Sequence, residues 1–202
     1  MHRAFVGSPL PPLCPLADVY AFLSPQVCTP FAGSHDVPRL AVKGWSRFHD
    51  IVPSDVLSVV DTIHASPTLL ADALLSREST LVHGDPKMAN LGLAANGHRL
   101  VLIDWGTLTS YGPPAIDFAW YLAINQAAIG IDHERLLADV RISLQPLDED
   151  ALKLALLGAL VQLGWEKALG ATDNDPLTRQ RESEGLAWWI FRAREAIASW
   201  PT

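Results

Sequence analysis

The chain has 202 residues, of which 49% are hydrophobic and 18% charged, and this composition predicts a globular protein with a substantial core. Its formal net charge of -7 argues against a protein that holds a nucleic acid duplex through the phosphates. The two cysteines, Cys14 and Cys28, have no CxxC or CxxH partner, so they indicate a reducing cytoplasm rather than a disulfide framework or a zinc site.

Residues 1–53 differ in composition from the rest of the chain, because eight of the 15 prolines lie there. Prolines interrupt the apolar run at the start, which argues against a signal peptide. The hydrophobic periodicity is poor, and it predicts loops and turns with one short helix over residues 16–23. We expect a Pro-rich N-terminal segment over residues 1–53 and the main domain over residues 54–202.

A helical periodicity begins at Val56, and Ser54 or Asp55 can cap this helix. Pro67 ends it. Between Pro67 and residue 83 we expect a second short helix over residues 68–75 and a short strand over residues 81–82.

A small hairpin is predicted next. Residues 91–93 and 100–103 form its strands, and Asn96-Gly97 favours a tight turn between them. Asn90 precedes the first strand and Asp104 follows the second. We therefore expect Asn90 and Asp104 to lie close together at the open end of the hairpin.

After a Gly/Pro-rich loop, apolar residues follow the helical period to the end of the chain. The longest apolar stretch, residues 151–165, carries Lys153 and Gln162 and is short for a bilayer span, so it predicts a buried helix and no membrane insertion. Gly170 suits a helix end, and Asp175 a helix start. The helices expected here cover residues 115–128, 133–144, 148–169 and 176–200.

Two short motifs carry the chemistry. Residues 83–90 read HGDPKMAN and residues 103–106 read IDWG, so an acid, an amide and a second acid stand at a fixed spacing. In phosphoryl transfer of the kinase type, one carboxylate orients and deprotonates the attacking hydroxyl, while an amide and another carboxylate hold magnesium against the nucleotide's phosphates. We assign Asp85 as the catalytic base, and Asn90 and Asp104 as the residues that bind magnesium and, through it, the nucleotide. The alternative roles, a turn-forming amide and a cap, explain the combination less well.

Other residues of the motifs have more than one interpretation. Lys87 can offset the charge of the transferred phosphoryl group as a catalytic residue, or it is a surface lysine, and the sequence favours neither. His83 is expected to shape its loop, because Asp85 already fills the role of the base. Asp117 is expected to cap its helix or to accept hydrogen bonds from the backbone of the loop.

These motifs resemble those of the aminoglycoside phosphotransferase family, whose fold is similar to that of protein and choline kinases. The family signature is His-Gly-Asp, four variable residues and Asn, followed by Ile/Leu-Asp-Trp/Phe. The segment GPPAIDFAWYL resembles the family's Gly-Pro…Asp-Leu-Ala helix, and the likeness is close over residues 81–125. The resemblance implies that Asp85 is the base, that Asn90 and Asp104 bind Mg²⁺, and that ATP is the co-substrate. Lys87 stands where many protein kinases have a phosphate-contacting lysine.

The resemblance also implies an N-terminal lobe with a Gly-rich loop, a strand lysine and a helical glutamate. Gly33-Ser34 is not such a loop, and Lys43 in AVKGW lacks the strand-turn-strand that should precede it. We therefore expect an α+β, mostly helical fold: the C-terminal lobe of a kinase-like phosphotransferase with a small catalytic β-hairpin, its N-terminal β-lobe missing or truncated. The chain is then part of a longer kinase, a truncated protein or a divergent one with an incomplete ATP site.

The predicted function is transfer of the γ-phosphate of ATP to a hydroxyl of a small molecule. An aminoglycoside or a similar amino sugar or alcohol suits an acidic protein. The absent lobe motivates an alternative, an inactive pseudoenzyme or binding module, and a helical hydrolase that uses Asp85 and Asp104 as a carboxylate pair on a metal is a third. The expected partners are a nucleotide and a small-molecule acceptor, without nucleic acid or membrane.

Overall fold

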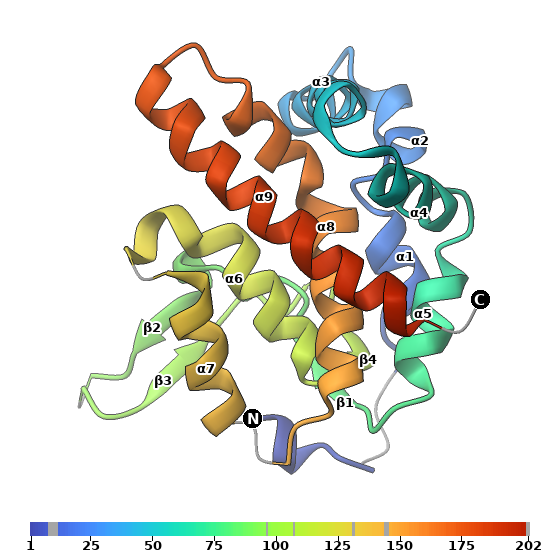
Figure 1. Cartoon of the computed structure of the whole chain (residues 1–202). Helices are drawn as coiled ribbons and strands as arrows, with labels where there is room; N and C mark the ends of the chain where they lie inside the picture. Colours follow the sequence, from blue (N-terminus) through green and yellow to red (C-terminus); the bar gives the residue numbers. More distant parts are fainter. Residues whose placement is uncertain (8–11, 96, 107, 131, 144–145, 201–202) are drawn as a thin grey trace.

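A computed structural model describes residues 1–7, 12–95, 97–106, 108–130, 132–143 and 146–200. Most of them are helical, and two small antiparallel sheets complete the fold (Figure 1). The prediction of a mostly helical α+β protein with a small hairpin is confirmed. The elements in chain order are η1 (His2–Ala4), α1 (Leu16–Ala21), α2 (Pro25–Cys28), η2 (Thr29–Phe31), α3 (Asp36–Ile51), α4 (Ser54–Ala65), α5 (Thr68–Leu75), β1 (Thr80–Val82), η3 (Met88–Asn90), β2 (Leu91–Leu93), β3 (Leu100–Leu102), β4 (Ser110–Gly112), α6 (Ala115–Ile129), α7 (His133–Ser143), α8 (Glu149–Ala171) and α9 (Pro176–Ser199).

Helix α8 lies at the centre of the molecule. Most of its side chains between Ala151 and Ala168 are buried, and a helix that is apolar all round must be covered on all sides. Helices α3, α6 and α9 pack on it, and Figure 1 shows α9 crossing in front of it. Its buried Gln162 donates a hydrogen bond of 2.7 Å to the carbonyl oxygen of Val19, so this amide N–H is paired. The predicted buried helix is confirmed.

The structure differs from the prediction of loops and turns before residue 53. The short helix expected over residues 16–23 is present as α1, but the chain also forms the 16-residue helix α3. Pro38 lies in the first turn of α3, where a missing N–H breaks no helical hydrogen bond. Lys43 is part of this helix and therefore not a strand lysine. The division of the chain at residue 53 stays a prediction.

The predicted hairpin is confirmed: β2 and β3 pair antiparallel, with Leu91 opposite Leu102. Figure 1 shows it at the edge of the molecule. Asn96 of the predicted turn and residue 144 of a predicted helix lie outside the described residues. A second pairing, of β1 with β4, places Val82 opposite Ser110 and was not predicted. It brings the start of residues 83–90 next to the chain that leaves the hairpin.

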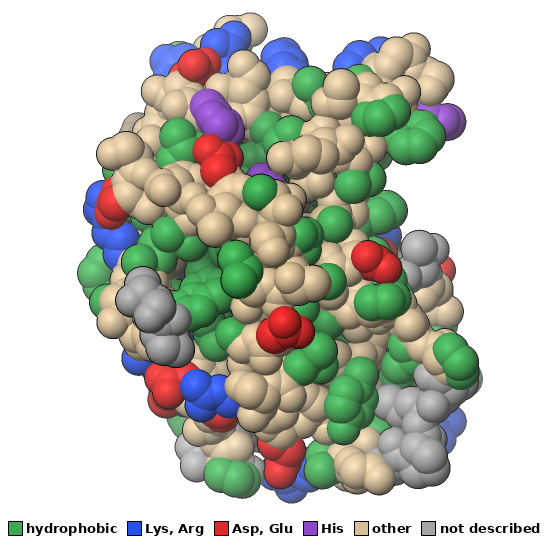
Figure 2. Space-filling view, turned by 90° about the vertical axis from the view of Figure 1, so that its right-hand side faces the viewer, with side chains coloured by type: hydrophobic (Ala, Val, Ile, Leu, Met, Phe, Trp, Pro, Cys, Tyr) green, Lys and Arg blue, Asp and Glu red, His purple; other side chains and the backbone are tan. Residues whose placement is uncertain are grey.

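The surface is of mixed character. Figure 2 shows Lys and Arg side chains mostly along the edge of one face, with hydrophobic and acidic side chains over its middle, as is typical of globular proteins. Within the described parts of the chain, every helix is too short or too polar to traverse a bilayer.

Gly44 lets α3 approach α8 closely. A Cβ atom at this position would lie 2.3 Å from the backbone carbonyl oxygen of Trp165, which cannot rotate away. We expect Gly44→Ala to lower the free energy of unfolding by about 2 kcal/mol, although alanine favours a helix by about 1 kcal/mol. Urea unfolding measures this. Gly33→Ala is the control, because its Cβ would meet nothing within 4 Å, and an equal loss in both variants would contradict the explanation.

His133 stacks on Trp188 with ring centroids 4.3 Å apart, and burial lowers the pKa of His133 to about 4. The unfolded chain binds this proton already near its ordinary pKa of about 6.5, so the stabilisation is complete above about pH 6.5 and is lost as the pH falls toward about 4. We expect a loss of about 2 kcal/mol from this residue at about pH 5. In thermal unfolding, His133→Phe should reduce the difference in melting temperature between neutral and acidic pH. The same difference should persist in a control variant of exposed His35, His35→Asn.

Candidate active site

The His83 loop (residues 83–90) follows β1 and is held by α6. The carboxylate of Asp117, in the first turn of α6, accepts hydrogen bonds of 2.9 Å from the backbone N–H groups of both His83 and Gly84. Burial raises the pKa of Asp117, whereas these two hydrogen bonds act to lower it. Of the two roles left open for Asp117, the structure therefore shows the anchoring of the loop.

Gly84 is required at its place in this loop. Its φ of 80° lies in the left-handed region, and a Cβ atom would lie 2.2 Å from the carbonyl oxygen of Leu108. Only glycine accepts both conditions without strain. The close approach of the loop to Leu108 fixes the start of the loop against the segment that follows the hairpin.

His83 shapes the loop, as its position in the motif predicts. Its Nδ1 accepts a hydrogen bond of 3.2 Å from the backbone N–H of Asp85, so Nε2 carries the proton and donates to the carbonyl oxygen of Ile103 at 2.9 Å. The ring also meets that of Trp105 edge-on, with centroids 4.6 Å apart. The imidazole thus joins the His83 loop to the IDWG motif and is not available as an acid or base.

Asp85 is surrounded by the other polar side chains of its loop. Its Oδ2 lies 2.6 Å from the ammonium Nζ of Lys87 and accepts a hydrogen bond of 3.0 Å from the amide Nδ2 of Asn90. The same amide donates to the backbone oxygen of Asp85 at 2.9 Å. Oδ1 of Asp85 is buried, and none of the described residues donates a hydrogen bond to it. Lys87, whose two interpretations were open, is thus an ion-pair partner of Asp85 with a side chain that is 40% exposed.

Asn90 and Asp104 lie near each other at the open end of the hairpin, as predicted. The backbone N–H of Ile103 donates to the carbonyl oxygen of Asn90 at 3.0 Å, which places Asp104 next to this contact. Asp104 has a φ of 62°, a left-handed conformation that non-glycine residues rarely adopt. Among the described residues, no three His, Cys, Asp or Glu side chains form a metal-binding group, so a cation here would need ligands from phosphate or water besides Asn90 and Asp104.

A cavity of about 230 Å³ opens at these residues. Asp85 and Asp104 both contribute to its wall, so the structure brings the two predicted carboxylates to one space. Lys87 and Asn90 are not part of the lining, but both contact Asp85. The lining is completed by His83, Gly106 and two apolar side chains, Phe22 and Leu108.

Asn125 is a residue of the site that the sequence analysis missed. From the buried face of α6, its Oδ1 accepts a hydrogen bond of 2.8 Å from the backbone N–H of Met88, while its Nδ2 donates to the carbonyl oxygen of Tyr121. Helix α6 therefore holds the loop at both ends, through Asp117 and Asn125. An amide in the middle of an apolar helix was the signal, because a buried amide needs partners.

The comparison with known families covers the part of the chain that holds these residues. The family model described as "Phosphotransferase enzyme family" (APH) matches residues 18–155, which is more than half of the chain and includes the whole candidate site. The chain belongs to this phosphotransferase family. The predicted resemblance is thereby confirmed, and a phosphotransferase is the general class of activity that membership indicates. No curated protein and no solved structure matches the chain.

The anchoring of the loop can be tested in Asp117→Asn. The asparagine keeps the size of the side chain but turns one acceptor oxygen into a donor that faces a backbone N–H. We expect a loss of about 2 kcal/mol in the free energy of unfolding. Hydrogen exchange should accelerate at the amides of His83 and Gly84 more than elsewhere. Asp72→Asn, on the exposed face of α5, is the control, and unchanged exchange at Gly84 in Asp117→Asn would contradict the anchoring.

Proposed function

We propose that the chain transfers the γ-phosphate of ATP to a hydroxyl group of a small molecule. The observation that carries this proposal is the single cavity lined by Asp85 and Asp104. Asn90 connects them, since its side chain bonds Asp85 and its backbone bonds the residue before Asp104. Membership of a phosphotransferase family supports the class of reaction.

In this proposal Asp85 is the general base. Its carboxylate lines the cavity and takes the proton of the acceptor hydroxyl, while Lys87 and Asn90 hold Oδ2. The two contacts at Oδ2 fix the direction of the carboxylate, which a base needs in order to meet the hydroxyl. Lys87 is partly exposed beside it, and we propose that its ammonium also contacts the transferred phosphoryl group.

Asn90 and Asp104 are proposed to hold Mg²⁺. An amide oxygen and a carboxylate are hard oxygen ligands of the kind Mg²⁺ prefers, and the phosphates of the nucleotide and water would complete the shell. The strained backbone of Asp104 supports this role, because such conformations concentrate at functional sites where the surrounding structure fixes them. When bound, the ion would offset the charge of the phosphates.

We further propose that the fold corresponds to the C-terminal lobe of a kinase-like phosphotransferase. The hairpin exposes large apolar side chains, with Leu93 71% and Leu100 64% exposed at its turn end and Ile103 53% exposed beside Asp104. A two-stranded hairpin is only marginally stable alone, so a partner that covers its apolar side chains would stabilise it. An apolar surface next to a phosphate site suits a nucleotide base. This surface supports the placement of ATP over the hairpin.

The acceptor is proposed to be a cationic alcohol such as an aminoglycoside or another amino sugar. The net charge of -7 favours the approach of a cation, and two carboxylates line the cavity. We propose that the protein acts in a reducing cytoplasm, in keeping with Cys14 and Cys28, which are free thiols.

The test separates binding from chemistry. We expect Asp104→Ala to abolish the rise in melting temperature that Mg-ATP gives the parent protein, because it removes a ligand of the ion. We expect Asp85→Asn to keep that rise but to lose transfer to an amino sugar by about 10³-fold, since the proton acceptor is lost while both proposed ligands of the ion remain. Thermal shift and a radiolabelled phosphate-transfer assay measure the two effects.

Asp139→Ala, an exposed aspartate of α7, is the matched control and should change neither measurement. If the parent shows no stabilisation by Mg-ATP and no transfer, the inactive alternative replaces the enzyme. Metal-dependent hydrolysis without nucleotide would favour the hydrolase.

A further inference from the structure

The N-terminal turn η1 lies on the outer edge of β1, beside the anchor of the His83 loop. The hydroxyl of Thr80 donates a hydrogen bond of 2.7 Å to the carbonyl oxygen of His2, and the ring Nδ1 of His2 lies 3.0 Å from the carbonyl oxygen of Leu81. The other ring nitrogen, Nε2, lies 3.5 Å from Oδ2 of Asp117. His2 is therefore fixed between the strand that leads into the loop and the carboxylate that holds it.

These contacts determine which protons the ring carries. A carbonyl oxygen only accepts, so Nδ1 of His2 must donate to Leu81. A neutral ring would then turn the lone pair of Nε2 toward the carboxylate of Asp117, and two acceptors would face each other. A proton on Nε2 makes the contact attractive, so the geometry favours a His2 imidazolium beside an ionised Asp117.

The charge of Asp117 matters for the loop because both of its oxygens accept backbone hydrogen bonds. Asp117 is 6% exposed, and burial favours its neutral form. A protonated carboxyl group would present a donor to one of the N–H groups of His83 and Gly84, and one of the two anchoring bonds would be lost. A cation beside Oδ2 opposes that protonation.

We infer that His2 is a positioning residue for phosphoryl transfer, whose imidazolium keeps Asp117 in the ionised state that anchors the backbone of His83 and Gly84. As far as catalysis is concerned, the inference rests on the proposed function. The anchoring of the loop by Asp117 does not depend on the proposed function. His2 is far from Asp85 in the sequence and acts on the base only through Asp117 and the loop.

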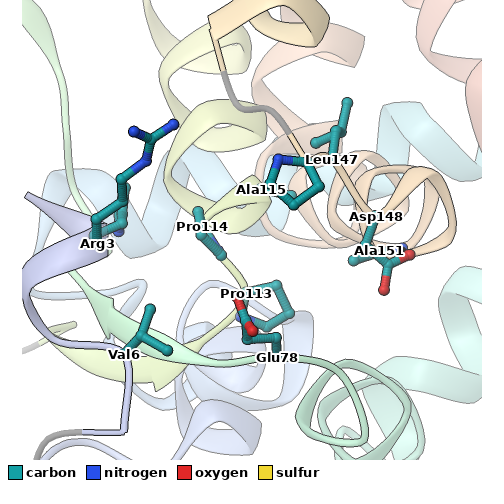
Figure 3. Close-up of a pocket in the computed structure, with 11 residues that line it drawn as sticks. Arg3, Val6, Glu78, Pro113, Pro114, Ala115, Leu147, Asp148 and Ala151 are labelled. Atoms are coloured by element: carbon teal, nitrogen blue, oxygen red, sulfur yellow. Dashed lines mark hydrogen bonds between the residues drawn. The ribbon is translucent and has the colours of Figure 1, made fainter.

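His2 also lines a second cavity, of about 150 Å³ (Figure 3). Figure 3 shows Arg3 and Val6 on one side of it, Leu147 and Asp148 on the other, and Pro113 between them. This volume holds several water molecules at about 30 Å³ each. The charged or titratable groups around the pair of His2 and Asp117 are Arg3, Glu78 and Asp148 in this cavity and His83 on the loop.

Nuclear magnetic resonance tests the inference without any assay of activity. The amide resonance of Gly84 reports whether Asp117 is ionised. On lowering the pH, we expect the midpoint of its shift to move up by about one pH unit in His2→Gln, which lacks the charge, relative to the parent. His2→Lys, which keeps a cation, should bring the midpoint back toward that of the parent. His35→Gln, at an exposed histidine, should leave it unchanged.

A midpoint in His2→Gln equal to that of the parent overturns the inference. If His2→Gln does not fold, the protonation of the His2 ring in the parent protein decides instead. Protons on both ring nitrogens at about pH 6, where His83 and Gly84 remain anchored, support the inference. A lone pair on Nε2 at that pH overturns it.

The second test measures the rate of phosphoryl transfer in the same His2 variants. We expect kcat of His2→Gln to fall by about tenfold, because the loop that carries the base is misplaced, and His2→Lys to recover most of it. A parent protein without transfer activity would overturn the proposed function, and the amide measurement would still decide on His2.

Discussion

The carboxylate of Asp117 accepts the backbone N–H groups of both His83 and Gly84, and the position of the candidate site follows from these two hydrogen bonds. Asp117 is placed by α6, and α6 is placed by its packing on the buried helix α8, to which the ammonium of Lys167 adds a hydrogen bond with the carbonyl oxygen of Ala123. The geometry of the loop therefore depends on helix packing as well as on the small hairpin beside it.

The helices beyond residue 54 could be predicted because their apolar residues follow the helical period, a local signal that α3 also carries. The failure at α3 has a definite cause. Pro25 and Pro38 lie in the first turns of helices, where proline is tolerated, so a segment rich in proline was taken for loops. The pairing of β1 with β4 was missed because it depends on contacts between distant parts of the chain, which no local pattern records.

The same distinction applies to the candidate site. The spacing of Asp85, Asn90 and Asp104 is written into two motifs at the ends of a hairpin, so their proximity could be predicted. The assignment of chemical roles to them remains a proposal. His2 and Asn125 could not be found in this way, because their partners are a distant carboxylate and a backbone N–H of the loop, and such pairings appear only in the folded chain.

The place of α8 in the chain has a consequence for biosynthesis. This helix fills the centre of the molecule, yet it begins only at Glu149, so the ribosome makes α1 to α7 before the surface they pack on exists. The apolar faces of α3 and α6 stay open during that time, and the hairpin and its motifs emerge with no core behind them. Folding of this core therefore follows the synthesis of α8, and until then the exposed apolar faces favour aggregation.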